Sequence, residues 1–279
     1  MVLGKMIARS DLLARRSPKG DGTRMSDRRT FFYRVSELLT PLCWSLLYLL
    51  RNRRQSWLTR EEIRLARFSF SQYGEDLVIE ELVNQLGIKR GFYVDVGAFD
   101  PVIGSNTLLL FKSGWSGINV DVEEEKIRHF RRVRARDWNV VCGVSKVAGR
   151  KTFARYAGAY LTRMITRGDN RSVAGDAAVD TFEVQAKPLQ SILDDSPFRA
   201  KPIDFLNIDC EGADLEVLQS LDFVVHQPRI VAVEACDIPV ERAICAFMGL
   251  KGYEMTHRLG VTRLFLPRKE ILALGWELS

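Results

Sequence analysis

Two periodicities of apolar residues alternate along the chain from Ser69 onward. Apolar residues at positions 78, 79, 82, 83 and 86 follow a helical spacing and predict a helix over 71–86, with Gly87 suited to its C-terminus. Short β-rich runs predict strands at 91–98, 117–122, 139–145, 203–208 and 229–235. One further helical pattern begins at Ser105, and another follows the second strand. Two more cover 213–221 and 240–250. Strands that alternate with helices at this spacing predict an open, mostly parallel α/β sheet.

The end of the chain and one central segment depart from this alternation. Residues 253–257 and 261–266 are separated by a turn that contains Gly260, and they predict an antiparallel hairpin at the C-terminus. Residues 151–156 predict a short β-arm, and 157–183 form a polar stretch with few apolar residues. An insertion that covers the substrate and a plain surface excursion are both compatible with this polar stretch.

Charge divides the chain into a basic N-terminal arm, residues 1–68, and a slightly acidic domain, residues 69–279. The arm holds 15 Lys and Arg against 6 Asp and Glu, whereas the rest of the chain holds 26 against 29. Proteins that bind the phosphate backbone carry positive charge on the binding face itself. The slightly acidic domain therefore argues against nucleic acid as a partner.

The arm contains one apolar stretch, residues 38–50, which predicts a helix. A bilayer-spanning helix needs ~20 apolar residues, so this stretch is too short to cross a membrane. Trp44, Tyr48 and the arginines that follow are typical of a helix on a membrane surface, with residues 30–54 against anionic lipid. A helix packed on the domain is the equal alternative.

The cysteines and the N-terminal residues bear on whether the protein is secreted or cytoplasmic. The five cysteines form neither a CxxC pair nor an even framework, and the first 30 residues lack the apolar segment of a secretory signal. We therefore expect a cytoplasmic protein, peripheral to the inner face of the membrane if the arm binds lipid.

Polar residues at the predicted strand ends indicate a nucleoside site. Gly97 follows the first strand, and Asp121 ends the second one 24 positions later. A glycine there lets backbone approach a ligand, and an acid about 20 residues on can accept both hydroxyls of a ribose. The GxGxxG turn that binds a pyrophosphate is absent, so S-adenosylmethionine fits better than NAD. We expect Asp95 near the methionine amine and the helix start near Asn106 at its carboxylate. The expected cofactor-binding residues are Asp95, Gly97, Ala98, Asn106, Asp121 and Ser145.

Several stretches together resemble the FkbM family of S-adenosylmethionine-dependent methyltransferases, in family order over roughly residues 69–266. They are SQYGED (71–76), FYVDVGAFDPVIGSNT (92–107), GWSGINVDVEEEK (114–126), IDFLNIDCEGADLEVLQSLD (203–222) and PRIVAVE (228–234). The resemblance implies a Rossmann-like methyltransferase fold and O-methylation, often of a sugar hydroxyl in a polysaccharide, glycolipid or glycosylated natural product. It also implies that Gln72 and Glu75 contact the cofactor or the acceptor. Val122 stands where the family usually has proline, and no family motif matches 157–183, so the acceptor is not identified.

Methyl transfer to a hydroxyl needs a general base or a metal to remove the proton. Asp209 and Glu211 follow the fourth strand as candidate catalytic residues, with Asp209 as the preferred base. Asp209, Glu234 and Asp237 are candidate ligands for one Mg²⁺, because that ion prefers oxygen ligands. Helix capping and ordinary hydrogen bonding are the alternative roles for Glu211 and Asp237. His257, near the hairpin, is a candidate acceptor contact, with a surface role as its alternative.

Two other functions share part of this pattern. An NAD-dependent sugar oxidoreductase would use the same ribose acid, but it predicts the GxGxxG turn that this chain lacks. A non-catalytic, membrane-associated binding protein would keep the fold and would bind the cofactor without turnover.

Overall fold

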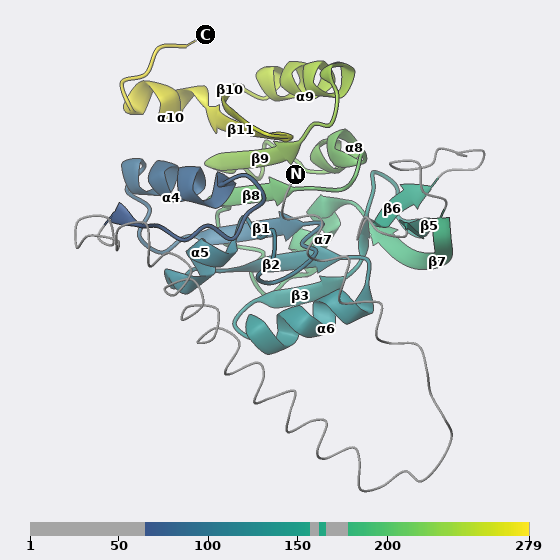
Figure 1. Ribbon diagram of the computed structural model, residues 1–279. Coiled ribbons are helices and arrows are strands. Elements are labelled where there is room, and N and C mark those ends of the chain that lie inside the picture. Colours follow the sequence, from purple (N-terminus) through teal and green to yellow (C-terminus); the bar gives the residue numbers. More distant parts are fainter. Residues whose placement is uncertain (1–64, 157–161, 166–177, 279) are drawn as a thin grey trace, which may run out of the picture. The chain divides into compact units, whose positions relative to one another are not determined.

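The computed structural model describes residues 65–156, 162–165 and 178–278. The chain divides into two units, Met1–Arg67 and Phe68–Ser279 (Figure 1), and nearly all described residues belong to the second. The apolar helix predicted at 38–50 lies outside the described residues. Within the described part, no helix has the length and apolar character needed to cross a membrane.

A seven-stranded sheet forms the centre of the second unit. Its strands follow the order β10-β11-β9-β8-β1-β2-β3. Neighbouring strands from β9 to β3 are parallel, whereas β11 is antiparallel to β9, and β10 to β11. The prediction of a mostly parallel α/β sheet is confirmed. The strand bounds are β1 Phe92–Val96, β2 Ser116–Asp121, β3 Trp138–Val141, β8 Phe205–Ile208, β9 Ile230–Glu234, β10 Tyr253–Leu259 and β11 Thr262–Pro267.

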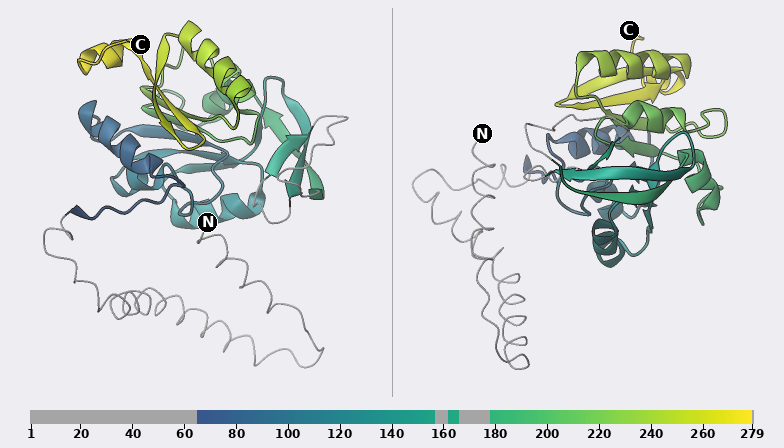
Figure 2. Two further views of the ribbon diagram at one scale, coloured as in Figure 1. Left: turned by 45° about the horizontal axis from the view of Figure 1, so that its top comes forward. Right: turned by 90° about the vertical axis from the view of Figure 1, so that its right-hand side faces the viewer.

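Both faces of this sheet are covered by helices (Figures 1 and 2), which explains why its central strands are buried along nearly their whole length. Successive residues of a strand point to opposite faces. Tyr93 and Phe205 accordingly pack in one apolar cluster, and their neighbours Val94 and Leu206 pack in the other. The helices are α4 Glu75–Gln85, α5 Leu108–Lys112, α6 Glu124–Val133, α7 Leu189–Asp195, α8 Asp214–Gln219, α9 Ile238–Leu250 and α10 Arg268–Ala273.

A second, four-stranded sheet lies beyond the carboxyl ends of the parallel strands (Figures 1 and 2). Its order is β4-β7-β5-β6. The β-arm predicted at 151–156 is confirmed as part of β5, whereas the sequence reasoning missed β6 and β7. The strand bounds are β4 Gly143–Val144, β5 Gly149–Tyr156, β6 Thr162–Ile165 and β7 Ala178–Lys187.

The third predicted strand, 139–145, is wrong as one continuous element. Pairing of β3 with β2 ends at Val141, and β4 pairs with β7 of the second sheet instead. The chain therefore changes sheets at Cys142. Apolar residues on both sides of this position hid the change, because both pieces have the composition of a strand.

Candidate active site

The carboxyl ends of β1, β2, β8 and β9 form one edge of the large sheet. The register places Val96 opposite both Val120 and Ile208, and Ile208 opposite Val233. The residues that come directly after these paired positions therefore meet at this edge of the sheet, because the strands are parallel. They include Gly97, Asp121, Asp209 and Glu234, all of which the sequence reasoning selected.

Gly97 is required by a close approach of the chain to itself. Its φ is +77°, and a Cβ atom there would lie 1.7 Å from the backbone oxygen of Asp209. The sequence reasoning explained this glycine by the approach of a ligand, whereas the structure shows that the neighbouring strand end already demands it. Ala98, which follows, is buried, and its N–H donates to Val120 O at 3.1 Å.

Asp121 is a buried carboxylate, 6% exposed, at the end of β2. It accepts hydrogen bonds from the backbone N–H groups of Phe99 at 3.0 Å and Glu123 at 2.9 Å, and Lys126 Nζ lies 3.9 Å away. Burial raises the pKa of Asp121, and the charge of Lys126 opposes that rise. Two carboxylate oxygens offer about four acceptor positions, so capacity remains for further hydrogen bonds.

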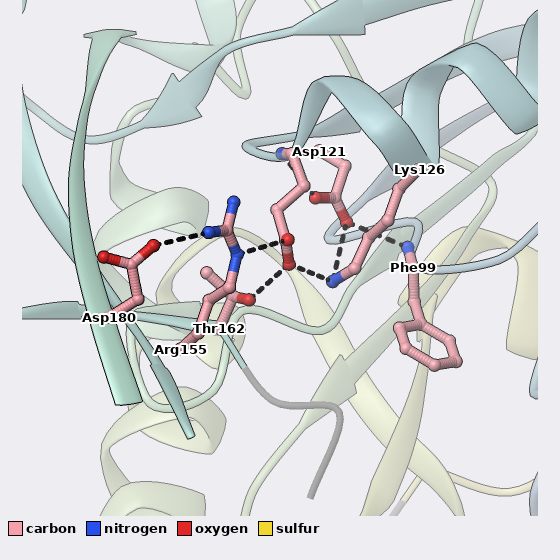
Figure 3. A network of polar contacts seen from close by, with 7 residues as sticks. Phe99, Asp121, Lys126, Arg155, Thr162 and Asp180 are labelled. Carbon is pink, nitrogen blue, oxygen red and sulfur yellow. Dashed lines mark hydrogen bonds and ion pairs between the residues drawn. The ribbon is translucent and has the colours of Figure 1, made fainter. Parts of the chain in front are cut away.

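Glu123 was not selected from the sequence, yet this N-cap residue of α6 bonds to Arg155 and Thr162 of the second sheet, which are labelled in Figure 3. Its carboxylate accepts from Thr162 Oγ1 at 2.5 Å and from Arg155 Nε at 2.7 Å, and it pairs with Lys126 at 2.9 Å. Arg155 also pairs with Asp180 of β7 at 2.8 Å. Burial alone would raise the pKa of Glu123, but these hydrogen bonds and cations lower it to about 2. We call these residues, together with Asp121, the Glu123 network.

A cluster of carboxylates occupies the end of β8. Asp209 is an exposed residue, although the surrounding protein desolvates part of its carboxylate. This desolvation raises its pKa well above the usual range, and the charges of Glu234, Glu211 and Asp214 act in the same direction. Burial and the same kind of repulsion raise the pKa of Glu211 to about 7. A carboxyl group with a raised pKa is a stronger base once it is ionised.

The turn after Asp209 brings Glu211 into this cluster. Asp214, 2% exposed, accepts from the backbone N–H groups of Cys210 at 2.8 Å and Gly212 at 2.9 Å. Glu211 has a left-handed φ of 52°, which turns its side chain away from the alternation of a continued strand. Asp214 was not predicted, and its burial raises its own pKa to about 7.

The structure does not assemble the predicted Mg²⁺ site. Asp237 instead caps α9, because its side chain accepts from Val240 N at 2.8 Å. Across residues 65–156, 162–165 and 178–278, no group of three or more His, Cys, Asp or Glu side chains is placed to hold a metal ion. Glu234 Oε2 is buried without a hydrogen-bond partner among the described residues. Capping was the alternative given for Asp237, and it is confirmed.

Asp95 is held from two sides inside the protein. It is 2% exposed and accepts from Thr107 Oγ1 at 2.7 Å and from Asn207 Nδ2 at 2.9 Å. Asn106 in turn donates to Asn207 Oδ1 at 3.0 Å, so two predicted cofactor residues share one network. Ser145 is fully buried, and its hydroxyl donates to a backbone carbonyl two residues ahead at 2.7 Å.

The predicted acceptor contacts are spread over several elements. Glu75 is buried at the start of α4 and accepts from Tyr73 N at 2.7 Å, which fixes that turn. Gln72 remains exposed beside it. His257 is half-buried on β10, two strands away from Glu234, and burial lowers its pKa. Of these residues, Gln72 alone is exposed, and the structure does not bring His257 to the carboxylate cluster.

Fold and site together define a class of protein, an α/β protein with a ligand site at the carboxyl edge of a parallel sheet. The family model for the FkbM methyltransferase domain matches residues 95–255, which is more than half of the chain. The chain therefore belongs to the FkbM methyltransferase family. No curated protein matches it in sequence.

Proposed function

We propose that this protein is an S-adenosylmethionine-dependent O-methyltransferase that acts on a sugar hydroxyl of a polysaccharide, glycolipid or glycosylated natural product. The observation that supports the proposal best is the position of two carboxylates at the carboxyl edge of the large sheet. Asp121 ends β2, and Asp209 follows β8, with β1 between these two strands. An acid suited to a ribose and a carboxylate with a raised pKa thus lie on the same side of the sheet.

Each end of the cofactor would have its own partners in this chain. Asp121 has acceptor capacity left for the ribose hydroxyls, and the ionised form of Asp95 would favour the methionine amine. The absence of a GxGxxG turn supports S-adenosylmethionine over NAD. When bound, S-adenosylmethionine would supply an activated methyl group.

Asp209 is the base in this proposal. Asp209 would take the proton of the acceptor hydroxyl while that oxygen receives the methyl group from bound S-adenosylmethionine. Its raised pKa brings its basicity nearer to what this proton transfer needs, so activity should increase as pH rises and Asp209 ionises. Glu211, whose pKa is about 7, would adjust the charge beside it.

Titration of the full chain with S-adenosylmethionine and with NAD tests the cofactor. We expect calorimetry to show that the protein binds S-adenosylmethionine and does not bind NAD. In a second experiment, we expect labelled methyl groups to be transferred from S-adenosylmethionine to a member of a panel of polysaccharides and glycolipids. Binding of NAD instead would favour an oxidoreductase. Binding of S-adenosylmethionine without transfer to any glycan would favour a non-catalytic protein.

We also propose that residues 30–54 of the basic arm bind anionic membrane from the cytoplasmic side. The support is the sequence alone: an apolar stretch with Trp44 and Tyr48, followed by Arg51, Arg53 and Arg54. Each basic residue near an anionic surface contributes about 1 kcal/mol. The full chain should sediment with anionic liposomes at low salt, and replacement of the three arginines by Gln should weaken sedimentation. Equal sedimentation of both proteins, or of neither, would contradict the proposal.

A further inference from the structure

Arg134 is fully buried, unlike the arginines around it. Its side chain is 0% exposed, whereas Arg131, Arg132 and Arg136 are exposed. A buried guanidinium is costly unless its donors are satisfied. Arg134 makes four hydrogen bonds, and its charged group also stacks near the rings of Phe130 at 5.1 Å and Phe111 at 5.7 Å. Within the described part of the chain, none of these bonds goes to a carboxylate.

All acceptors of Arg134 lie in the segment that follows β1, residues 97–107, which we call the cofactor loop. Nε and Nη2 donate to Pro101 O at 3.2 and 2.6 Å. Nη2 also donates to Ser105 Oγ at 2.7 Å, and Nη1 donates to Thr107 Oγ1 at 2.6 Å. One side chain at the end of α6 therefore fixes three residues of the loop, from Pro101 to Thr107.

Thr107 connects Arg134 to Asp95 through hydrogen bonds. A hydroxyl has one proton to donate, and an arginine offers no acceptor. Because Thr107 Oγ1 accepts from Arg134, its own proton is available for Asp95 Oδ2, 2.7 Å away. The Asp95 carboxylate is thereby oriented, and both the Thr107 bond and the Arg134 charge oppose the rise in its pKa that burial causes.

We propose that Arg134 and Thr107 are positioning residues for cofactor binding, Arg134 by fixing the cofactor loop and Thr107 by orienting the Asp95 carboxylate. The inference rests on the proposed function, which places S-adenosylmethionine at this edge. Neither residue contacts the cofactor in this proposal. Both act through Asp95 and through the backbone of the loop.

A pair of substitutions at Thr107 tests the inference in the full chain. Thr107→Val removes the hydroxyl and keeps the shape, whereas Thr107→Ser keeps the hydroxyl. We expect Thr107→Val to weaken S-adenosylmethionine binding at least tenfold in calorimetry at pH 7.5 and Thr107→Ser to stay within about threefold of wild type. The Thr107→Val loss should grow as pH falls from 9 to 6, because Asp95 would then protonate more easily. Arg134→Lys keeps the charge but not the fork of donors, and it should also weaken binding.

Tyr253→Phe is the control. Tyr253 lies on the edge strand β10, and its buried hydroxyl donates to Pro228 O at 2.8 Å, a backbone carbonyl outside the cofactor loop. This substitution also removes one buried hydroxyl that donates a hydrogen bond, so it should lower Tm and leave the affinity for S-adenosylmethionine unchanged. If Tyr253→Phe weakens binding as much as Thr107→Val does, the role of Thr107 is only structural and the inference is wrong.

Different results would overturn the positioning role of Thr107 and the proposed function. If wild type binds S-adenosylmethionine and Thr107→Val binds it equally well, the positioning inference is overturned and the proposed function stands. If wild type does not bind S-adenosylmethionine at all, the proposed function is overturned, and the inference falls with it.

Discussion

The two sheets are stabilised in different ways. In the large sheet, all five residues of β1 are buried, and the sheet contributes apolar side chains to a core cluster on each face. In the second sheet, β7 alternates between exposed residues such as Glu183 and partly buried ones such as Phe182. Apolar burial therefore dominates the first sheet, whereas polar side chains contribute much more to the attachment of the second.

The attachments of the second sheet also differ from one end to the other. Near β4, Ser145 N donates to Lys187 O at 3.1 Å, and the chain runs directly on from the large sheet. At β5 and β6, the contacts pass through the Glu123 network (Figure 3). This difference indicates that the β5 and β6 end responds to charge and salt, while the β4 end and the large sheet do not.

The largest expected effect of a substitution is a loss of turnover at the carboxyl edge of the large sheet. Asp209→Asn removes the proposed base and should lower turnover by roughly 10²–10⁴, with the affinity for S-adenosylmethionine nearly unchanged, because general-base catalysis contributes about that much. Transfer of labelled methyl groups measures this. Asp237→Asn changes a carboxylate on the same side of the sheet that only caps α9, so it should leave turnover within a few-fold. Full activity of Asp209→Asn would remove Asp209 as the base.

A smaller loss is expected where the two regions meet. Asp121→Ala should weaken S-adenosylmethionine binding by about 1.5–3 kcal/mol, the range for hydrogen bonds to a charged group. Calorimetry measures the affinity, and circular dichroism checks that the fold is kept. Unchanged affinity with an intact fold would remove Asp121 as the ribose acid.

Glu123→Gln should loosen the second sheet and leave the large sheet intact. The substitution removes the charge that Arg155 and Lys126 share, and we expect a loss of about 1 kcal/mol in local stability. Hydrogen exchange should become faster for amides of β5 and remain unchanged for β1. Equal acceleration in both strands would show that the two sheets unfold together and would contradict the comparison.

The pKa of Glu123 determines how this attachment depends on pH. The folded protein lowers the pKa from 4.5 to about 2. The stabilisation is therefore fully present above about pH 4.5 and is lost as pH falls toward 2. Near neutral pH, salt should lower the protection of β5 amides, whereas moderate changes of pH should leave their protection unchanged once the intrinsic exchange rate at each pH is divided out.

The smallest effect is expected from an exposed ion pair within the second sheet. Arg150 and Glu183 lie 3.4 Å apart with side chains 77% and 57% exposed. Arg150→Gln should change stability by less than about 0.5 kcal/mol, because solvent screens such pairs. Thermal unfolding measures this, and a loss as large as that of Glu123→Gln would show that the Glu123 network has no special role.

The sequence predicted the large sheet because its signals are local. The run that becomes β1 is apolar apart from Asp95 and is followed by a glycine, and the carboxylates Asp121, Asp209 and Glu234 can be placed at strand ends by counting along the chain. Parallel strands then require these residues to share one edge. β7 also had a local signal, since Phe182, Val184 and Ala186 alternate with polar residues, but the sequence reasoning did not use it.

The remaining features depend on contacts between distant parts of the chain. Arg134 stands in one short run with Arg131, Arg132 and Arg136, and Glu123 stands beside Glu124 and Glu125. Tertiary contacts with the cofactor loop satisfy the donors of Arg134, and the approach of β5 and β6 adds Arg155 and Thr162 to the partners of Glu123. The sequence by itself thus determined the sheet and its carboxylate edge, because hydrophobic periodicity is written into neighbouring residues. Tertiary structure decided which of several identical charged side chains became buried and paired, because desolvation and ion pairing depend on the surface that packs opposite.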